Sequence, residues 1–333
     1  MTSIIILIVS LGIILAGAEI FVNGIEWLGK RLELSEGAVG SVLAAVGTAL
    51  PETLIPVIAI IFGHGQEGHD IGIGAILGAP LMLSTLAMFI TGASVMIFKQ
   101  RRKHGKKIAA DYTTVSRDLC FFIIIYLTAI LTGFIPSSLR LVKILIGILI
   151  VISYLWYVII LMKEERVESE YDIPSCYFDR KRARLSLVIL QVMVALGIIV
   201  IGANMFVNSI KEVASMFMVP AFILAIIITP IATELPEKFN SIIWISREKD
   251  TLALGNITGA MVFQSSLIPA LGIFLTDWHL TTGAFLSGII ALMSAGLIFY
   301  QLRIRKHITA GILMAGGALY LLFILLVVKG IIS

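Results

Sequence analysis

GAEIFVNGIEWLGKRLELSEGAVGSVLAAVGTALPET, at residues 17–53, occurs a second time in modified form as GANMFVNSIKEVASMFMVPAFILAIIITPIATELPEK at residues 202–238. The two stretches align without a gap at an offset of 185, and ten of the 37 positions are identical. A further match follows at an offset of 181, where GAILGA (74–79) aligns with GNITGA (255–260). These matches predict an internal duplication, and the duplication decides the fold.

The composition of the 333-residue chain is that of a membrane protein. Hydrophobic residues make up 59% and charged residues only 14%, against roughly 25% charged in soluble domains. The mean hydropathy is +1.03. Two cysteines exclude a disulfide framework, and the five histidines have none of the spacings of a zinc or haem site. We therefore expect neither a soluble protein nor an enzyme with a resident cofactor.

Ten apolar runs are long enough to cross about 30 Å of hydrocarbon as helices. A β-barrel is excluded because runs such as FFIIIYLTAIL (121–131) do not alternate between polar and apolar residues. No Lys or Arg precedes the first run, so we interpret it as a retained helix rather than a signal peptide. The predicted spans are 3–29, 39–62, 71–98, 119–135, 141–162, 185–207, 218–245, 252–275, 283–301 and 308–328.

The loops between these spans alternate between two sides of the membrane. One set (30–38, 99–118, 163–184, 246–251 and 302–307) holds 20 of the 25 Lys and Arg residues. The positive-inside rule then predicts that these loops are cytoplasmic and that both termini are outside, at the plasma membrane. We interpret the basic runs KQRRKHGKK and DRKRAR as topology signals that contact lipid headgroups, not as a nucleic-acid site.

The duplication assigns five spans to each repeat. Because five is odd, the second copy must enter the membrane from the opposite side, which makes the repeats inverted. We predict an all-α, ten-helix protein with a first repeat at 1–162, a cytoplasmic linker at 163–184 and a second repeat at 185–333. Inverted repeats are typical of secondary transporters, whose substrate sites lie near the midplane between the repeats.

Each matched stretch contains a T-x-L-P-E motif inside an apolar span. The proline removes a backbone hydrogen bond, and lipid tolerates such a break only where the freed groups line a cavity or contact a ligand. Thr48 and Glu52 are four residues apart, as are Thr233 and Glu237, so each pair shares one helical face. Two broken helices are thus predicted to present oxygen atoms to each other.

Carboxylate, hydroxyl and carbonyl oxygens together are the ligands that hard cations such as Ca²⁺ prefer. Glu52 and Glu237 as mere packing residues would place an ionisable group at this depth twice, at a cost of at least about 2.5–3.5 kcal/mol each. We therefore interpret both as cation ligands. For Thr48 and Thr233, two interpretations stay open: ligation, or a hydrogen bond to the carbonyl of their own kinked helix.

With the duplicated LPE motifs, the preceding GAxxFVN segments and the glycine pairs that follow, the chain resembles the cation/calcium exchanger superfamily, particularly prokaryotic sodium/calcium exchangers. The resemblance covers both repeats. It implies two inverted five-helix repeats in which Glu52 and Glu237 are the central cation ligands, with Thr48 and Thr233 beside them. It also implies alternating access, in which the helices that carry GAEIFVN and GANMFVN slide across the core.

The chain departs from the family pattern at several positions. The family usually has serine where this chain has Ala49 and Glu234, so one hydroxyl is lost and a third carboxylate is gained. After the glycine pair, an Asn or Asp of the family is replaced by Leu83 in one repeat and Gln264 in the other. We include Glu234 and Gln264 among the predicted ligands. Lys238, four residues after Glu234, is expected either to pair with it or to extend toward water.

These features predict an antiporter that exchanges a divalent cation, Ca²⁺, for Na⁺ at a midplane carboxylate site. H⁺ coupling, or another divalent cation such as Mg²⁺, remains open because of the altered ligands. A passive cation channel, or a sensor that kept the fold, is the rival from another class. The expected partners are divalent and monovalent cations and the lipid bilayer. We expect no nucleic acid and no cofactor, and a monomeric protein.

Overall fold

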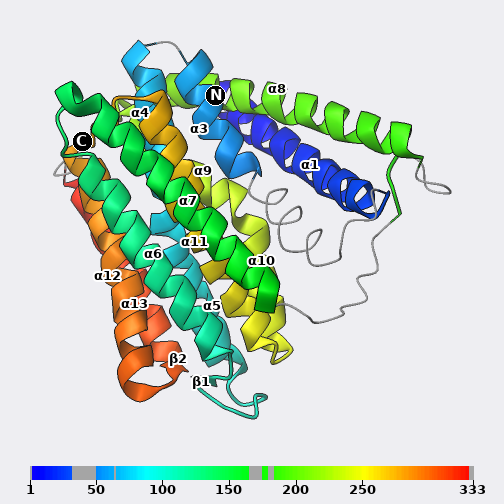
Figure 1. The fold of residues 1–333 in the computed structure, drawn as a ribbon, viewed down its shortest axis with the longest axis vertical. Helices are drawn as coiled ribbons and strands as arrows, with labels where there is room; N and C mark the ends of the chain where they lie inside the picture. Colours follow the sequence, from blue (N-terminus) through cyan, green and yellow to red (C-terminus); the bar gives the residue numbers. More distant parts are fainter. Residues whose placement is uncertain (1, 32–49, 64, 165–174, 179–183, 330–333) are drawn as a thin grey trace.

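The computed structural model describes residues 2–31, 50–63, 65–164, 175–178 and 184–329, and this part of the chain is almost entirely helical (Figure 1). The helical elements are α1 (Thr2–Arg31), α3 (Leu50–Phe62), α4 (Gly65–Met82), the π-helical turn η2 (Leu83–Ala87), α5 (Met88–Phe98), α6 (Tyr112–Thr132), the 3-10 turn η3 (Ser137–Leu139), α7 (Arg140–Glu164), α8 (Leu185–Phe217), α9 (Ala221–Thr233), α10 (Leu235–Ser246), α11 (Asp250–Leu275), α12 (Thr282–Arg305) and α13 (Ala310–Val328). Two short strands, β1 (Lys107–Ile108) and β2 (Ile308–Thr309), pair antiparallel.

Eight of the ten predicted spans coincide with helices that are long and apolar enough to cross a membrane, counted over the described residues. The other two are represented by shorter apolar helices. In the predicted span 218–245, the helix is divided into α9 and α10 at Glu234. In the predicted span 39–62, α3 begins at Leu50, and residues 39–49 lie outside the described part of the chain.

Two long helices, α1 and α8, run side by side at an angle to the remaining bundle (Figure 1). A Cβ atom added at Gly17 would lie 2.8 Å from Ile199, and one added at Gly202 would lie 2.9 Å from Ile14. The contact is therefore reciprocal, because both the glycines and the isoleucines are related by the offset of 185. With 33 residues, α8 is about 50 Å long and exceeds the roughly 30 Å of hydrocarbon, so it must tilt or extend beyond the bilayer.

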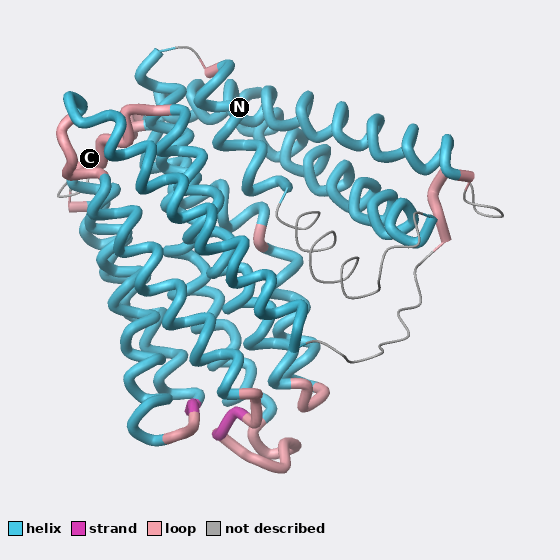
Figure 2. The backbone as a smooth tube through the Cα atoms, viewed as in Figure 1, coloured by secondary structure: helices cyan, strands magenta, loops and turns pink. Residues whose placement is uncertain are grey.

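Where the structure describes the loops, the contacts between them agree with the two groups that the sequence predicts. Strands β1 and β2 join the loops 99–118 and 302–307 at the lower end of the bundle (Figure 2). On the other predicted side, Lys143 donates to the carbonyl of Asp277 at 2.5 Å, and Ser137 is hydrogen-bonded to His279 at 2.7 Å. The predicted alternation of loops agrees with these contacts.

A buried ion pair ties together the loops at the β1–β2 end. Arg102 donates to both carboxylate oxygens of Asp250, at 2.7 and 2.5 Å, and also to the carbonyl of Ile245 at 3.0 Å. The backbone N–H of Ala109 donates to the same carboxylate at 2.8 Å. Both side chains of the pair are almost fully buried. This bidentate geometry is the strong form of an Arg–carboxylate interaction.

Replacing Arg102 should destabilise the fold, because it leaves the Asp250 carboxylate buried without its countercharge. Breaking a buried pair in this way costs roughly 3–5 kcal/mol, so we expect Arg102→Met to lower the Tm of the detergent-purified protein by several degrees. Arg101→Met, at the exposed neighbouring position, is the matched control and should leave the Tm unchanged. Equal Tm values for the two variants would show that the pair does not stabilise these loops.

Candidate cation site

The predicted ligands that the structure describes lie on α3, α9, α10 and α11. Helix α4 packs against α3 and α9, and α11 packs against α4, α3 and α10. Helix α9 ends at Thr233 and α10 begins at Leu235, so Glu234 alone separates them, with φ −94° and ψ 6°. Pro236 occupies the first turn of α10, where its missing N–H leaves no hydrogen bond unmade.

The second T-x-L-P-E motif forms a buried polar centre around this break. The hydroxyl of Thr233 donates to the carbonyl of Thr229 at 3.0 Å. Two roles were left open for Thr233, cation ligation and a hydrogen bond to a carbonyl of its own helix, and this contact is the second of them. The lone pairs of the hydroxyl oxygen remain able to bind a cation. Glu234 is only 1% exposed.

Lys238 pairs with Glu234, as one of its two predicted roles requires. The ammonium Nζ lies 3.3 Å from Oε2 of Glu234 and 3.4 Å from the carbonyl oxygen of Pro230. Because Lys238 is 4% exposed, the alternative that its ammonium extends toward water is wrong. The extra carboxylate of this repeat thus has an ammonium beside it.

The first motif places Glu52 in the first turn of α3. Its side chain is 6% exposed, in a helix that packs against α4 and α8. Thr48 lies outside the described residues, as does the side chain of Glu237, whose backbone belongs to the first turn of α10. The predicted convergence of Glu52 and Glu237 on one cation therefore stays a prediction.

Three buried oxygen atoms near the centre have no hydrogen-bond donor or acceptor within the described part of the chain: Oε1 of Gln264, Oγ1 of Thr229 and the hydroxyl of Tyr320. Gln264, a predicted ligand, is 3% exposed on α11. Tyr320 of α13 lies close enough to Glu234 for the two side chains to interact electrostatically. Buried polar atoms are ordinarily hydrogen-bonded, so such oxygens are suited to a cation or an ordered water molecule.

The described residues contain no group of three His, Cys, Asp or Glu side chains placed to hold a metal ion. A site built from carboxylates alone is therefore not seen in this part of the chain. The predicted ligands whose side chains the structure describes offer oxygen atoms of mixed type: carboxylate oxygens of Glu52 and Glu234, the hydroxyl of Thr233 and the amide oxygen of Gln264. Mixed oxygen sets suit a hard cation that must also be released.

A π-helical turn is a polar feature of the central helices that the sequence reasoning missed. It interrupts the span from α4 to α5 at Leu83–Ala87, and π-turns frequently occur at functional sites. Ser84 donates to the carbonyl of Pro80 at 2.7 Å, and Thr85 donates to the carbonyl of Leu81. From α12, Ser294 donates to the carbonyl of Ser84 at 2.5 Å.

One signal in the sequence could have indicated these hydroxyl groups. The offset of 181 that aligns the glycine pairs also places Ser84 on Ser265 and Thr85 on Ser266. Ser265 and Ser266 are likewise buried, and both donate to the carbonyl of Val262, at 3.1 and 2.7 Å. The two repeats thus keep a hydroxyl pair at equivalent positions.

The glycine pairs differ between the repeats. A Cβ atom added at Gly74 would lie 2.8 Å from the carbonyl oxygen of Phe222, and one added at Gly78 would lie even closer to the carbonyl oxygen of Ile226. Helices α4 and α9 therefore approach closely, as the first pair predicts. At Gly255 and Gly259, no described atom lies within 4 Å of an added Cβ, so the close approach predicted for the second pair is not seen among the described residues.

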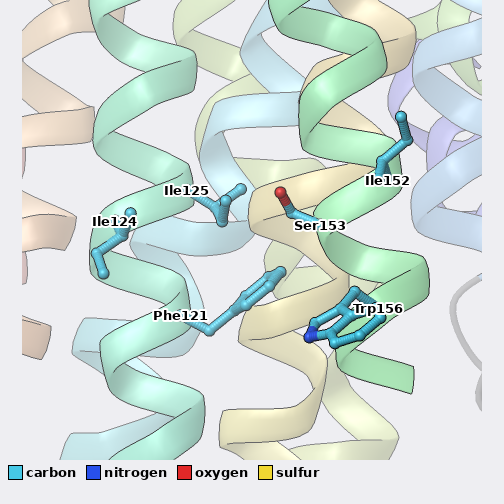
Figure 3. Close-up of a pocket in the computed structure, with 6 residues that line it drawn as sticks. All are labelled: Phe121, Ile124, Ile125, Ile152, Ser153 and Trp156. Carbon is cyan, nitrogen blue, oxygen red and sulfur yellow. The ribbon is translucent and has the colours of Figure 1, made fainter. Parts of the chain in front are cut away.

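A surface pocket lies between α6 and α7, and none of the candidate ligands lines it (Figure 3). Its volume is about 350 Å³, and Ser153 is the one polar residue in its lining, beside Phe121, Ile124, Ile125, Ile152 and Trp156. An apolar hollow without a carboxylate offers nothing to a cation. We therefore assign the candidate site to the polar residues of α3, α9, α10 and α11.

Comparison of the sequence with known protein families identifies one family that matches nearly the whole chain. The sequence profile of the family described as "Sodium/calcium exchanger protein" matches residues 2–163 and 187–329. The chain is 21% identical over 316 residues to inner membrane protein YrbG of Escherichia coli (strain K12), which covers 93% of each chain.

Two solved structures share the fold. The chain is similar to the H⁺/Ca²⁺ exchanger CAX with a TM-score of 0.72 and 20% identity, over 98% of this chain and 82% of that one. It is also similar to the sodium-calcium exchanger NCX_Mj, with a TM-score of 0.58 and 18% identity over 97% of both chains. At these identities the likeness concerns the fold alone.

The close contact at Gly78 yields a stability prediction. In Gly78→Ala, the added methyl would press on the carbonyl of Ile226 and on Pro230, whose Cγ lies 2.8 Å away, and overpacking of this kind costs about 1–3 kcal/mol. We expect a lower Tm in detergent. Gly296→Ala on α12 is the control, because a Cβ there meets no described atom within 4 Å. A Gly78→Ala protein as stable as the Gly296→Ala protein would contradict the close packing.

Proposed function

The chain belongs to the sodium/calcium exchanger family, and from this premise we propose that it is a secondary active antiporter that exchanges Ca²⁺ for Na⁺ by alternating access. The observation that carries the proposal is Glu52, a carboxyl group 6% exposed in the first turn of an apolar helix at the centre of the bundle. Ionisable groups at this depth mark ion pathways. A carboxylate at this depth is also a ligand that a hard cation such as Ca²⁺ prefers.

We place the cation between Glu52 and Glu237, with Thr48, Thr233, Glu234 and Gln264 as further oxygen ligands. Three facts support this ligand set: Thr233 and Glu234 flank the break between α9 and α10, Gln264 offers a buried oxygen without a described donor, and α11 packs against both α3 and α10. Ca²⁺ takes six to eight oxygen ligands. The set is large enough for a Ca²⁺ that keeps few of its waters.

We further propose that residues 1–162 and 185–333 form two inverted five-helix repeats joined by a cytoplasmic linker at 163–184. The reciprocal contacts of Gly17 with Ile199 and of Gly202 with Ile14 support a two-fold relation. The packing of whole helices supports it too. Helix α4 packs against α12 as α11 packs against α6, and α5 packs against α13 as α11 packs against α7.

Alternating access then follows from the charge of the site. Carboxylates that converge in a dry cavity cannot all stay ionised without cations, so Ca²⁺ and monovalent cations compete for the same oxygens. An empty charged site is costly to carry across the membrane, and this penalty enforces exchange rather than leak. The close glycine contacts between α1 and α8 hold these two helices together, so that they can slide over the core as one unit.

Proton coupling is the second candidate, and two substitutions favour it. The hydroxyl of the family's serine is absent at Ala49, which removes a sodium ligand, while Glu234 adds a carboxylate that can accept a proton. The same two changes, at Ala49 and Glu234, would accommodate Mg²⁺ in place of Ca²⁺. We keep Na⁺ as the proposed coupling ion and let transport measurements decide between the two.

We place the protein in the plasma membrane as a monomer, with both termini outside. The distribution of Lys and Arg supports this orientation, since 20 of 25 lie in one set of loops. The contacts among the loops 99–118, 246–251 and 302–307, through β1–β2 and the Arg102–Asp250 pair, support the assignment of these three loops to one side.

Isotope flux distinguishes the candidate functions. In proteoliposomes, we expect ⁴⁵Ca²⁺ uptake when an outward Na⁺ gradient is imposed. Uptake with a pH gradient alone would assign H⁺ as the coupling ion, and competition by unlabelled Mg²⁺ would report on divalent selectivity. Uptake that follows the membrane potential without any countertransported ion would identify a channel. No uptake under either gradient would refute calcium exchange.

Neutralising Glu52 should abolish transport. We expect Glu52→Gln and Glu237→Gln each to reduce ⁴⁵Ca²⁺ uptake to background, because the amide supplies no charge to balance the cation. Glu67→Gln is the matched control, since Glu67 is an exposed acid at the start of α4. The Tm of each variant verifies folding. Wild-type uptake by both site variants would place the cation elsewhere.

A further inference from the structure

Lys238 places a fixed positive charge among the groups assigned to cation binding. On the basis of the proposed function, we propose that its ammonium acts as a tethered monovalent cation. In this role it neutralises Glu234 permanently and holds the exchange site at a net charge of −2. One divalent cation is then exchanged for two monovalent cations, and each transport cycle moves no net charge.

The surroundings of the ammonium resemble those of a bound alkali cation. Nζ of Lys238 contacts a carboxylate oxygen of Glu234 at 3.3 Å and the backbone carbonyl oxygen of Pro230 at 3.4 Å. Carboxylate and backbone carbonyl oxygens are also the ligands that a broken membrane helix offers to Na⁺. The contacts span the break itself, because Pro230 belongs to α9 and Lys238 to α10.

Comparison of the two repeat sequences shows that only the second motif carries this pair. At the offset of 185, Glu234 corresponds to Ala49 and Lys238 corresponds to Thr53. The first repeat therefore carries the same L-P-E motif with neither charge at these positions. A pair of buried charges that is present in one motif alone changes the electrostatics of that half of the site.

The charges give the expected stoichiometry. Glu52, Glu234 and Glu237 together carry three negative charges, and Lys238 reduces the total to −2, which is the charge of the two motif glutamates alone. One Ca²⁺ or two monovalent cations balance that charge completely. Without the ammonium the site would carry −3 and would accept three monovalent cations in exchange for one Ca²⁺. That exchange would move one net charge in each cycle.

The variants that test this proposal are Lys238→Thr, Glu234→Ala and the double variant. The double variant gives the second repeat the residues of the first at both positions, so it removes the pair while keeping the charge at −2. Each protein is reconstituted in proteoliposomes whose membrane potential is set with K⁺ and valinomycin. The equilibrium accumulation of ⁴⁵Ca²⁺ against a fixed gradient of the coupling ion is then measured.

We expect the accumulation ratio to be independent of potential in the wild-type protein and in the double variant. In Lys238→Thr, a potential of 100 mV should change the ratio about 50-fold, which corresponds to one elementary charge moved per cycle. Potential-dependent accumulation by the wild-type protein would overturn the inference while leaving calcium exchange intact. Potential-independent accumulation by Lys238→Thr would overturn it as well.

A binding measurement decides the question even if Lys238→Thr cannot be purified. The Tm of the detergent-solubilised protein is measured against Ca²⁺ concentration, because a bound ligand stabilises the folded state. In Glu234→Ala the ammonium loses its carboxylate and repels the divalent cation. We therefore expect at least about tenfold weaker Ca²⁺ binding than in the wild-type protein, and tighter binding in the double variant than in Glu234→Ala, because the double variant no longer carries the repelling ammonium. Wild-type affinity in Glu234→Ala would contradict the proposal, whereas a wild-type protein that binds Ca²⁺ without transporting it would contradict the proposed function alone.

Discussion

A charged group inside a membrane bundle needs an opposite charge beside it, and the centre of this protein depends on that requirement. Glu234 meets it with Lys238, whose ammonium lies 3.3 Å away. In our account, Glu52 meets it with the transported cation. The same physical demand thus gives a permanent partner to one carboxylate and an exchangeable partner to the other, and exchange follows because the second partner cannot leave without a replacement.

The backbone of the central helices is under a similar constraint, since lipid cannot satisfy an exposed carbonyl group. At the break between α9 and α10, the carbonyl of Pro230 accepts from the N–H of Glu234 and from the ammonium of Lys238. At the π-turn, the hydroxyl groups of Ser84 and Thr85 serve neighbouring carbonyls. At both interruptions of regular helix, polar groups of the protein itself therefore donate to backbone carbonyls.

Much of the fold and part of the candidate site could be predicted from the sequence, because membrane spans and repeats are local or periodic features. The apolar runs indicate the helices, and the i, i+4 spacing of Glu234 and Lys238 indicates their pairing. The offset of 185 anticipates the reciprocal contacts of Gly17 and Gly202.

Contacts that depend on tertiary packing could not be read in this way. Arg102 and Asp250 are 148 residues apart, and no repeat offset relates them. Nothing in the local sequence distinguishes Gly78, which packs tightly against α9, from Gly259, where an added Cβ would meet no described atom within 4 Å. The π-turn was missed because helical periodicity does not show where one residue is added to a turn. For Thr48 and the side chain of Glu237, the predicted roles stay predictions.

The central claim is that a cation binds at Glu52, and anomalous diffraction from crystals grown in Ca²⁺ tests it most directly. The account predicts an anomalous peak about 2.3–2.6 Å from the carboxylate oxygens of Glu52, with Glu237 as a second ligand and Lys238 still beside Glu234. A peak bound only by loop residues, or a central cation that does not contact Glu52, would contradict it.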